Sequence, residues 1–144
     1  MESDLTLPGQ KNRYITLDTS ALLALINNKD RNHVRVKEVL GLYSPPYLIS
    51  TGVLTEIAFL LETRFGFSAI NNFIKDVQKG FFQLEFDLGD LERARALAER
   101  YQNLPLGLAD ALVIACAERH GGAVISLDRH FWVVAGEGTI QVQP

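Results

Sequence analysis

Short apolar runs alternate along the chain with longer segments in which apolar residues recur every three or four positions. The short runs are rich in β-branched and aromatic residues and predict buried strands, whereas the longer spacing predicts amphipathic helices. Strands are predicted at 14–18, 47–50, 81–86, 123–128 and, at a sheet edge, 139–142; helices are predicted at 21–26, 31–43, 51–65, 69–79, 91–101 and 106–120. This alternation favours a three-layer α/β/α sandwich with a mainly parallel central sheet.

Polar and special residues mark the expected ends of these elements. Thr19 and Ser20 offer hydroxyl groups that can cap the first helix, and Ser68 offers one to the fourth. Gly66 is the expected stop of the helix at 51–65.

The length of 144 residues fits one domain, and 47% hydrophobic with 22% charged residues is typical of a globular protein. Residues 1–13 lack the apolar stretch of a signal peptide and are expected to be a loose leader before one domain at 14–144. The longest uncharged segment, 39–55, contains two prolines and two glycines, so no membrane span is expected. Cys116 lies in an apolar pattern and has no partner for a disulfide, which favours the cytoplasm.

Four carboxylates occupy positions that usually exclude charge. Asp18 and Asp128 each directly follow an apolar strand, and the carboxyl ends of parallel strands meet at one edge of a sheet. Glu56 has Phe59 and Leu60 three and four residues later, and we expect it to face inward. Asp110 falls on the apolar stripe of its predicted helix.

Each of these acids also has a structural interpretation. Asp18 before Thr-Ser can be a turn or capping residue, and Asp110 can favour the dipole of a helix N-terminus. If the four acids converge, their mutual repulsion requires protonation or bound cations. Oxygen ligands suit Mg²⁺ or Mn²⁺, whereas the three histidines lack the short spacing of a zinc site and are expected to be solvated or to cap helices: His33, His120 and His130.

Four segments in this order resemble the PIN domain family, and within it the VapC-type toxin ribonucleases. The segments are 17–22, 55–56, 104–111 and 126–131, and the likeness spans about residues 14–142. By this resemblance, the four acids correspond to the family's metal-binding quartet. Ser20 corresponds to its hydroxyl residue after the first acid, and Ser126 to a position that is usually threonine.

The resemblance implies metal-dependent endonucleolytic cleavage of RNA by a toxin that a partner antitoxin neutralises, with a homodimer as the expected assembly. We expect Asp18 and Asp110 to bind Mg²⁺ or Mn²⁺ directly. Glu56 is expected to bind metal or position water, and Asp128 is expected to act at the metal directly or through water. Ser20 either holds a carboxylate or phosphate, or simply caps a helix.

Contacts to RNA are less visible in the sequence. The net charge of −3 requires any basic surface to be local, and the candidates are Lys29, Arg31, Arg35, Lys37 and Arg129. Four aromatic residues are candidates for stacking on bases, although we expect most of them to be buried: Tyr14, Phe81, Phe82 and Trp132.

Two other functions remain open at this point. A non-catalytic PIN-like module would bind RNA or protein through the same fold, but it would not need all four acidic positions. A phosphatase would use Asp18, an aspartate after the first buried strand, as its nucleophile.

Overall fold

A five-stranded sheet forms the centre of the computed structural model, which describes residues 14–144. Every neighbouring pair of strands is parallel, and the order is β3-β2-β1-β4-β5. The mainly parallel sheet predicted from the sequence is therefore confirmed. The strands are β1 (Thr16–Leu17), β2 (Tyr47–Ser50), β3 (Phe82–Glu85), β4 (Ala123–Ile125) and β5 (Gln141–Gln143).

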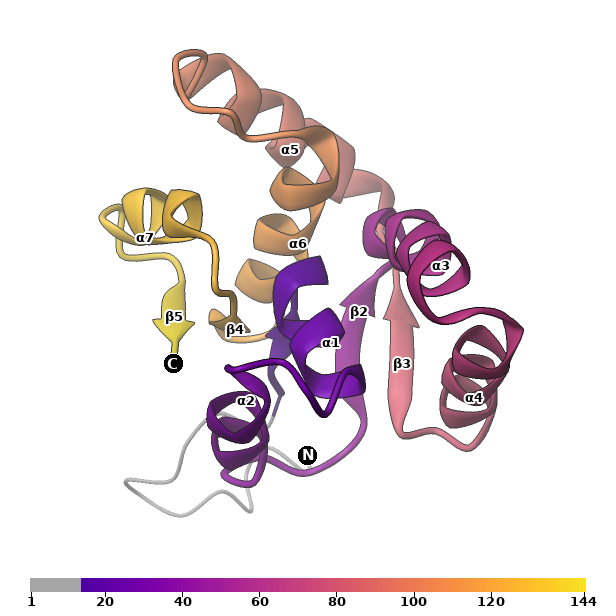
Figure 1. Ribbon diagram of the computed structural model, residues 1–144. Coiled ribbons are helices and arrows are strands. Elements are labelled where there is room, and N and C mark those ends of the chain that lie inside the picture. The colour runs from indigo at the N-terminus through magenta and orange to yellow at the C-terminus, as the bar shows by residue number, and fades with distance from the viewer. Residues whose placement is uncertain (1–13) are drawn as a thin grey trace.

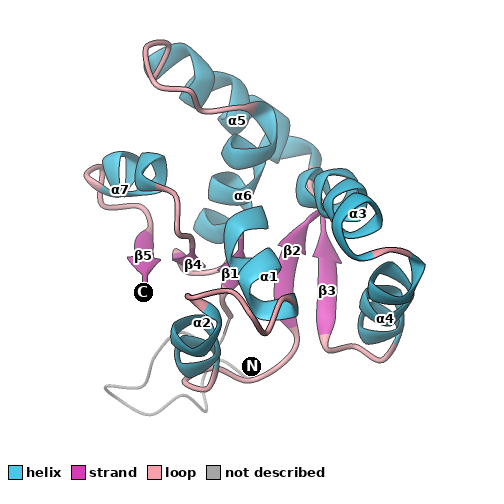
Figure 2. Cartoon of the chain, in the orientation of Figure 1, coloured by secondary structure: helices cyan, strands magenta, loops and turns pink. Residues whose placement is uncertain are grey.

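Helices connect all the strands and cover both faces of the sheet (Figures 1 and 2). Because parallel crossovers are right-handed, the helices leading from β1 to β3 lie on one face, and those leading from β3 to β5 lie on the other. The α/β/α sandwich is thus also confirmed. The helices are α1 (Thr19–Ile26), α2 (His33–Leu40), α3 (Thr51–Phe65), α4 (Phe67–Gln78), α5 (Leu88–Arg100), α6 (Leu108–Arg119) and α7 (Arg129–Ala135).

The direction of winding reverses at β1. The chain moves from β1 to β2 and β3, and then returns to place β4 on the other side of β1. Ligands of open parallel sheets bind beyond the carboxyl ends of the strands where the winding reverses. Asp18 and Asp128 follow β1 and β4, so both acids lie at this position.

Two predicted helix caps are wrong, and one helix was not predicted. Asp18, rather than Thr19 or Ser20, is the N-cap of α1, because its carboxylate accepts a hydrogen bond from the Ala21 amide. The interpretation of Asp18 as a capping residue is therefore confirmed. Ser68 does not cap α4, which already begins at Phe67 after Gly66. Helix α7 was not predicted; it begins where Asp128 accepts a hydrogen bond from the His130 amide.

The predicted leader at 1–13 lies outside the described residues. Within residues 14–144, no helix is both long and apolar enough to cross a membrane.

Candidate active site

Asp18 is the most buried of the four acids, with only 2% of its surface exposed. Three groups donate hydrogen bonds to its carboxylate. The Ala21 amide donates at 2.8 Å, the Ser20 hydroxyl at 2.7 Å and the Ser126 hydroxyl at 2.5 Å. Burial nevertheless outweighs these donors, and the nearby charge of Asp110 adds to it, so the pKa of Asp18 rises from 3.8 to about 6.

Ser126 links the ends of β1 and β4. Its hydroxyl donates to Asp18 and accepts a hydrogen bond from the Asp128 amide at 3.0 Å. The Ser20 hydroxyl forms a similar link, because it donates to Asp18 and accepts from the Leu127 amide at 3.0 Å. The two serines therefore fix the position of the Asp18 carboxylate relative to the loop that carries Asp128.

Glu56 does not face inward as the sequence predicted; it lies on the exposed side of α3. The buried face of this helix is instead formed by Val53, Ile57 and Leu61, while Phe59 is 65% exposed. The prediction relied on apolar neighbours, and one of those neighbours is itself on the surface. The Glu56 carboxylate still reaches the site, because it accepts a hydrogen bond from the hydroxyl of Thr19 at the start of α1.

Asp110 lies in the first turn of α6 and is partly buried. Its pKa is raised from 3.8 to about 6, first by burial and then by the negative charges of Asp128 and Glu56. The charge of His130 lowers this pKa by less than those causes raise it. Asp110 is thus electrostatically coupled to the three other acids. The structure brings all four predicted carboxylates to the same edge of the sheet.

Two residues of this cluster were missed by sequence reasoning. Thr19 was regarded as a possible cap, but its hydroxyl joins α1 to Glu56. His130 was regarded as one of three scattered histidines, but its Nδ1 atom lies 2.7 Å from an Asp128 oxygen. That nitrogen is buried and lacks a partner in hydrogen-bond geometry among the described residues. The position of His130 two residues after a strand-end acid was the available signal.

The donor set is chemically suited to a hard divalent cation. The four carboxylates and the hydroxyls that contact them supply oxygen ligands. Burial is the main cause of the raised pKa values of Asp18 and Asp110, and the neighbouring carboxylates add to it. Among residues 14–144, however, no group of three or more His, Cys, Asp or Glu side chains is arranged closely enough to hold a metal ion. Two of the carboxylates are turned toward other partners, Glu56 toward Thr19 and Asp128 toward the start of α7.

The other predicted positions fall into two groups. Two of the basic candidates, Lys29 and Arg31, lie in the loop after α1, and two others, Arg35 and Lys37, lie on α2. All four come after the end of α1 that is opposite to Asp18. Arg129 is exposed and directly follows Asp128.

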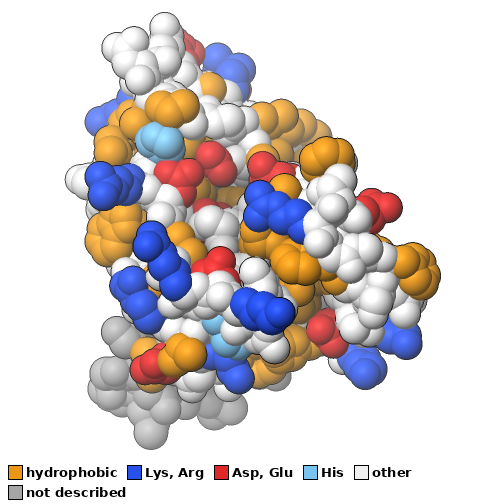
Figure 3. Space-filling view, viewed as in Figure 1, with side chains coloured by type: hydrophobic (Ala, Val, Ile, Leu, Met, Phe, Trp, Pro, Cys, Tyr) orange, Lys and Arg blue, Asp and Glu red, His pale blue; other side chains and the backbone are white. Residues whose placement is uncertain are grey.

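Figure 3 shows acidic side chains gathered in a hollow between α7 and α3, with basic side chains on both sides of it.

Two of the three histidines, His33 and His120, contact groups outside the cluster of four acids. His33 Nδ1 lies 2.9 Å from the carbonyl oxygen of Ala24, and His120 Nε2 lies 2.8 Å from a Glu85 carboxylate oxygen. Cys116 is buried beside Thr16, in agreement with its place in an apolar pattern.

Comparison with known proteins agrees with this architecture. The family model of the PIN domain matches residues 15–137, so the chain belongs to the PIN domain family. Ribonuclease VapC26 of Mycobacterium tuberculosis (strain ATCC 25618 / H37Rv) is 30% identical over 118 residues, which cover 80% of this chain and 87% of that protein.

Solved structures show the same fold. The crystal structure of Mycobacterium tuberculosis VapC20, a sarcin-ricin loop cleaving toxin, aligns with a TM-score of 0.74 and 25% identity over 90% of this chain and 99% of that one. A toxin-antitoxin complex from Klebsiella pneumoniae aligns with a TM-score of 0.65 and 22% identity, covering 88% and 95% of the two chains. The family predicted from four short segments is therefore confirmed.

Proposed function

We propose that this chain is a metal-dependent endoribonuclease of the VapC type, the toxin of a toxin-antitoxin pair, acting in the cytoplasm. The observation that carries the proposal is the mutual position of the acids. Asp110 is coupled to Asp18, Asp128 and Glu56 at the edge where the winding of the sheet reverses. The relatives whose names record ribonuclease or toxin activity support RNA as the substrate.

Asp18 and Asp110 would hold Mg²⁺ or Mn²⁺ directly, with Glu56 and Asp128 completing the set directly or through water. When bound, such an ion lowers the pKa of a water molecule and offsets the charge of the scissile phosphate. The chain's own contribution is to fix the carboxylates. Ser20 and Ser126 hold Asp18, Thr19 holds Glu56, and the Ser126 hydroxyl positions the Asp128 backbone.

RNA cleavage by the purified chain, with Mg²⁺ or Mn²⁺ added and then removed by EDTA, tests this function. We expect activity to require the ion, and Asp18→Asn and Asp110→Asn each to lower the rate at least about a hundredfold, as for loss of a preorganised electrostatic group. Asp87→Asn is the matched control, because Asp87 is exposed and caps α5 away from the cluster. Undiminished cleavage in excess EDTA, or near-normal rates in both variants, would contradict the proposal. A covalent phosphate trapped on Asp18 would favour a phosphatase instead.

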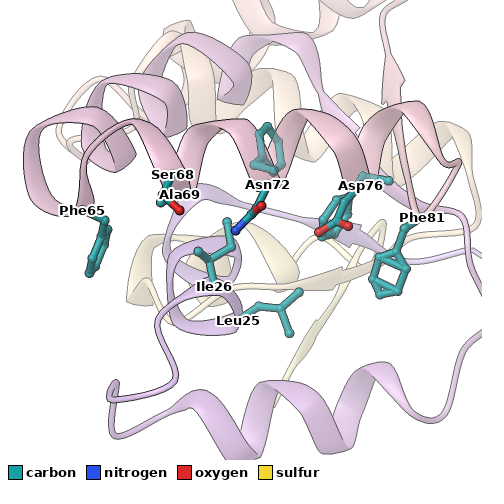
Figure 4. Close-up of a pocket in the computed structure, with 10 residues that line it drawn as sticks. Leu25, Ile26, Phe65, Ser68, Ala69, Asn72, Asp76 and Phe81 are labelled. Atoms are coloured by element: carbon teal, nitrogen blue, oxygen red, sulfur yellow. The ribbon is translucent and has the colours of Figure 1, made fainter.

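The antitoxin is proposed to occupy an apolar groove together with the acidic cluster. The groove has a volume of about 490 Å³ and lies between α1 and α4. Figure 4 shows Leu25 and Ile26 on one side of it and Ser68, Ala69, Asn72 and Asp76 of α4 on the other. Because α1 has eight residues, about 12 Å separates this groove from the α1 end that carries Asp18.

An amphipathic segment with a basic residue would match both features. Its apolar side chains would enter the groove, and its Arg or Lys would pair with the carboxylates in place of the metal ion. The structural neighbours described as toxin-antitoxin complexes support a partner of this kind. The expected product of co-purification is a small protein with such a segment near its C-terminus.

Substitution in each half of the proposed interface tests it. Asn72→Tyr would fill the groove and should weaken inhibition, whereas Lys75→Tyr, also exposed on α4 but outside the groove, should not. Asp18→Asn/Asp110→Asn should weaken binding of the antitoxin as well. An inhibitor that binds this double variant as tightly as it binds the unmodified chain would argue against a contact with the acids.

The expected homodimer is tested separately by the mass of the chain in solution.

A further inference from the structure

The solvent-facing side of α7 carries an aromatic ring next to a cation. Phe131 and Val134 of this helix pack into the core, whereas Trp132 is 51% exposed. Arg129 is exposed three residues earlier. Because residues three apart are neighbours on a helix surface, Arg129 and Trp132 form a pair on the outer face of α7. The prediction that most of the four aromatic candidates are buried is wrong: Phe82 is buried and Tyr14 partly buried, but Phe81 and Trp132 are exposed.

This pair lies beside the acidic cluster. Asp128 caps α7, and Trp132 follows it by four residues, which is about one helical turn or 6 Å of rise. Asp128 in turn raises the pKa of Asp110. A nucleotide adjoining the one at the carboxylates is therefore within reach of the α7 surface.

The negative charge of the four carboxylates means that an RNA strand needs favourable contacts next to them. Four carboxylates repel an RNA backbone, and the net charge of −3 provides no general attraction. A guanidinium next to the cluster can bind a phosphate, and an exposed indole can stack on a base of any sequence. Both contacts together would hold a single strand at a point where its backbone is otherwise repelled.

We propose that Trp132 is a base-stacking platform, and Arg129 its phosphate contact, for the single-stranded RNA that enters the acidic cluster. This inference rests on the proposed ribonuclease function, and it assigns the substrate contact to α7. The alternative occupant of the same surface, a partner protein, is distinguished by the experiment.

Trp132 is the only tryptophan of the chain, so intrinsic fluorescence reports on this position alone. A single-stranded RNA oligonucleotide would be titrated into the full-length chain carrying Asp110→Asn, in chelator, so that cleavage is suppressed. We expect the fluorescence to be quenched, with a midpoint that matches binding measured by polarisation of labelled RNA. In the same background, Trp132→Ala should weaken RNA binding about five- to a hundredfold, and Trp132→Phe should retain most of the affinity.

Val133→Ala is the matched control, because Val133 is equally exposed on α7 and cannot stack. Arg129→Gln should reduce the salt dependence of binding, as the loss of one phosphate contact requires. Unchanged fluorescence during RNA binding, together with unchanged affinity in Trp132→Ala, would overturn the inference while leaving the nuclease function intact. Quenching by the antitoxin but not by RNA would also overturn it. Absence of both RNA binding and cleavage would overturn the function and the inference together.

Discussion

Short hydroxyl side chains determine how the carboxylates of this site are held. The Ser126 hydroxyl donates to the Asp18 carboxylate and accepts from the Asp128 amide through one oxygen atom. Thr19 and Ser20 perform the same task for Glu56 and Asp18. If the acids act as proposed, RNA cleavage should therefore depend on these hydroxyl groups as well as on the carboxylates.

We expect Ser126→Ala to lower RNA cleavage about 10- to 100-fold, the range typical for groups that orient metal ligands. The substitution removes the hydrogen bond to Asp18 and the acceptor of the Asp128 amide. Ser126→Thr keeps the hydroxyl and should restore most of the rate. The melting temperature measured in chelator alongside the rate separates loss of positioning from loss of fold. Equal activity of the alanine and threonine variants would remove Ser126 from this role.

The raised pKa of Asp110 predicts how the stability of the metal-free fold depends on pH. Its pKa rises from 3.8 to about 6 through burial and then through Asp128 and Glu56. The folded chain thus binds more protons than the unfolded chain between these values, so this group destabilises the metal-free fold as pH rises through that window. In chelator, Asp110→Asn should melt at the same temperature as the unmodified chain at about pH 4 and at a higher temperature above about pH 6. A difference that does not change with pH would contradict this electrostatic account.

Individual residues of the site could be predicted where the reason was local. Asp18 and Asp128 follow buried strands, and a parallel sheet places such positions at one edge whatever the details of packing. Glu56 could not be oriented correctly, because the buried face of α3 is decided by contacts with other elements. The partner of Thr19 is 37 positions away, and no local pattern specifies a contact of that kind.

The helices that support Asp110 are joined by an ion pair away from the site. Arg119 of α6 binds the Asp90 carboxylate of α5 with two hydrogen bonds, at 2.7 and 2.9 Å. The Asp90 side chain is only 4% exposed, whereas that of Arg119 is 32% exposed. A buried carboxylate left without its partner is costly, so this pair should matter to the packing of α5 on α6.

Arg119→Met should lower the free energy of unfolding by about 2–3 kcal/mol, below the usual range for a fully buried pair because the arginine is partly exposed. Chemical denaturation provides the measurement. Arg95→Met is the control, because Arg95 pairs with Glu92 and Glu99 on the surface of α5 and should cost less than about 1 kcal/mol. Similar losses in the two variants would mean that burial of Asp90 has no energetic consequence.

The bounds of a helix could be predicted where the sequence marks both its start and its end. They could not be predicted where only one capping residue marks the helix. Helix α3 has the predicted bounds, because the Ser50 side chain caps its start and Gly66 adopts a positive φ of 84° at its end. Helix α5 begins three residues before the predicted start, because Asp87 caps it. Helix α7 has only seven residues, so it presents too few turns for a periodic pattern.

At the scale of the whole molecule, the topology explains why distant acids meet. Strands β1 and β4 are neighbours although more than a hundred positions separate Thr16 from Val124. Helix α6, the last helix of the crossover from β3 to β4, carries Asp110 to the same edge. Helix α1 begins at that edge and ends at the apolar groove, so the proposed substrate and antitoxin sites share one helix.

The central claim is that the four acids form a metal site and not a structural cluster. Its most direct test is the melting temperature of the unmodified chain and of Asp110→Asn, each measured in chelator and over a titration of Mn²⁺ at neutral pH. The account predicts that the metal-free variant is at least as stable as the unmodified chain, because mutual repulsion is relieved. It also predicts that Mn²⁺ stabilises the unmodified chain progressively and the variant little or not at all. A large loss of stability in the metal-free variant, with an unchanged Mn²⁺-induced shift, would show instead that Asp110 holds the fold together.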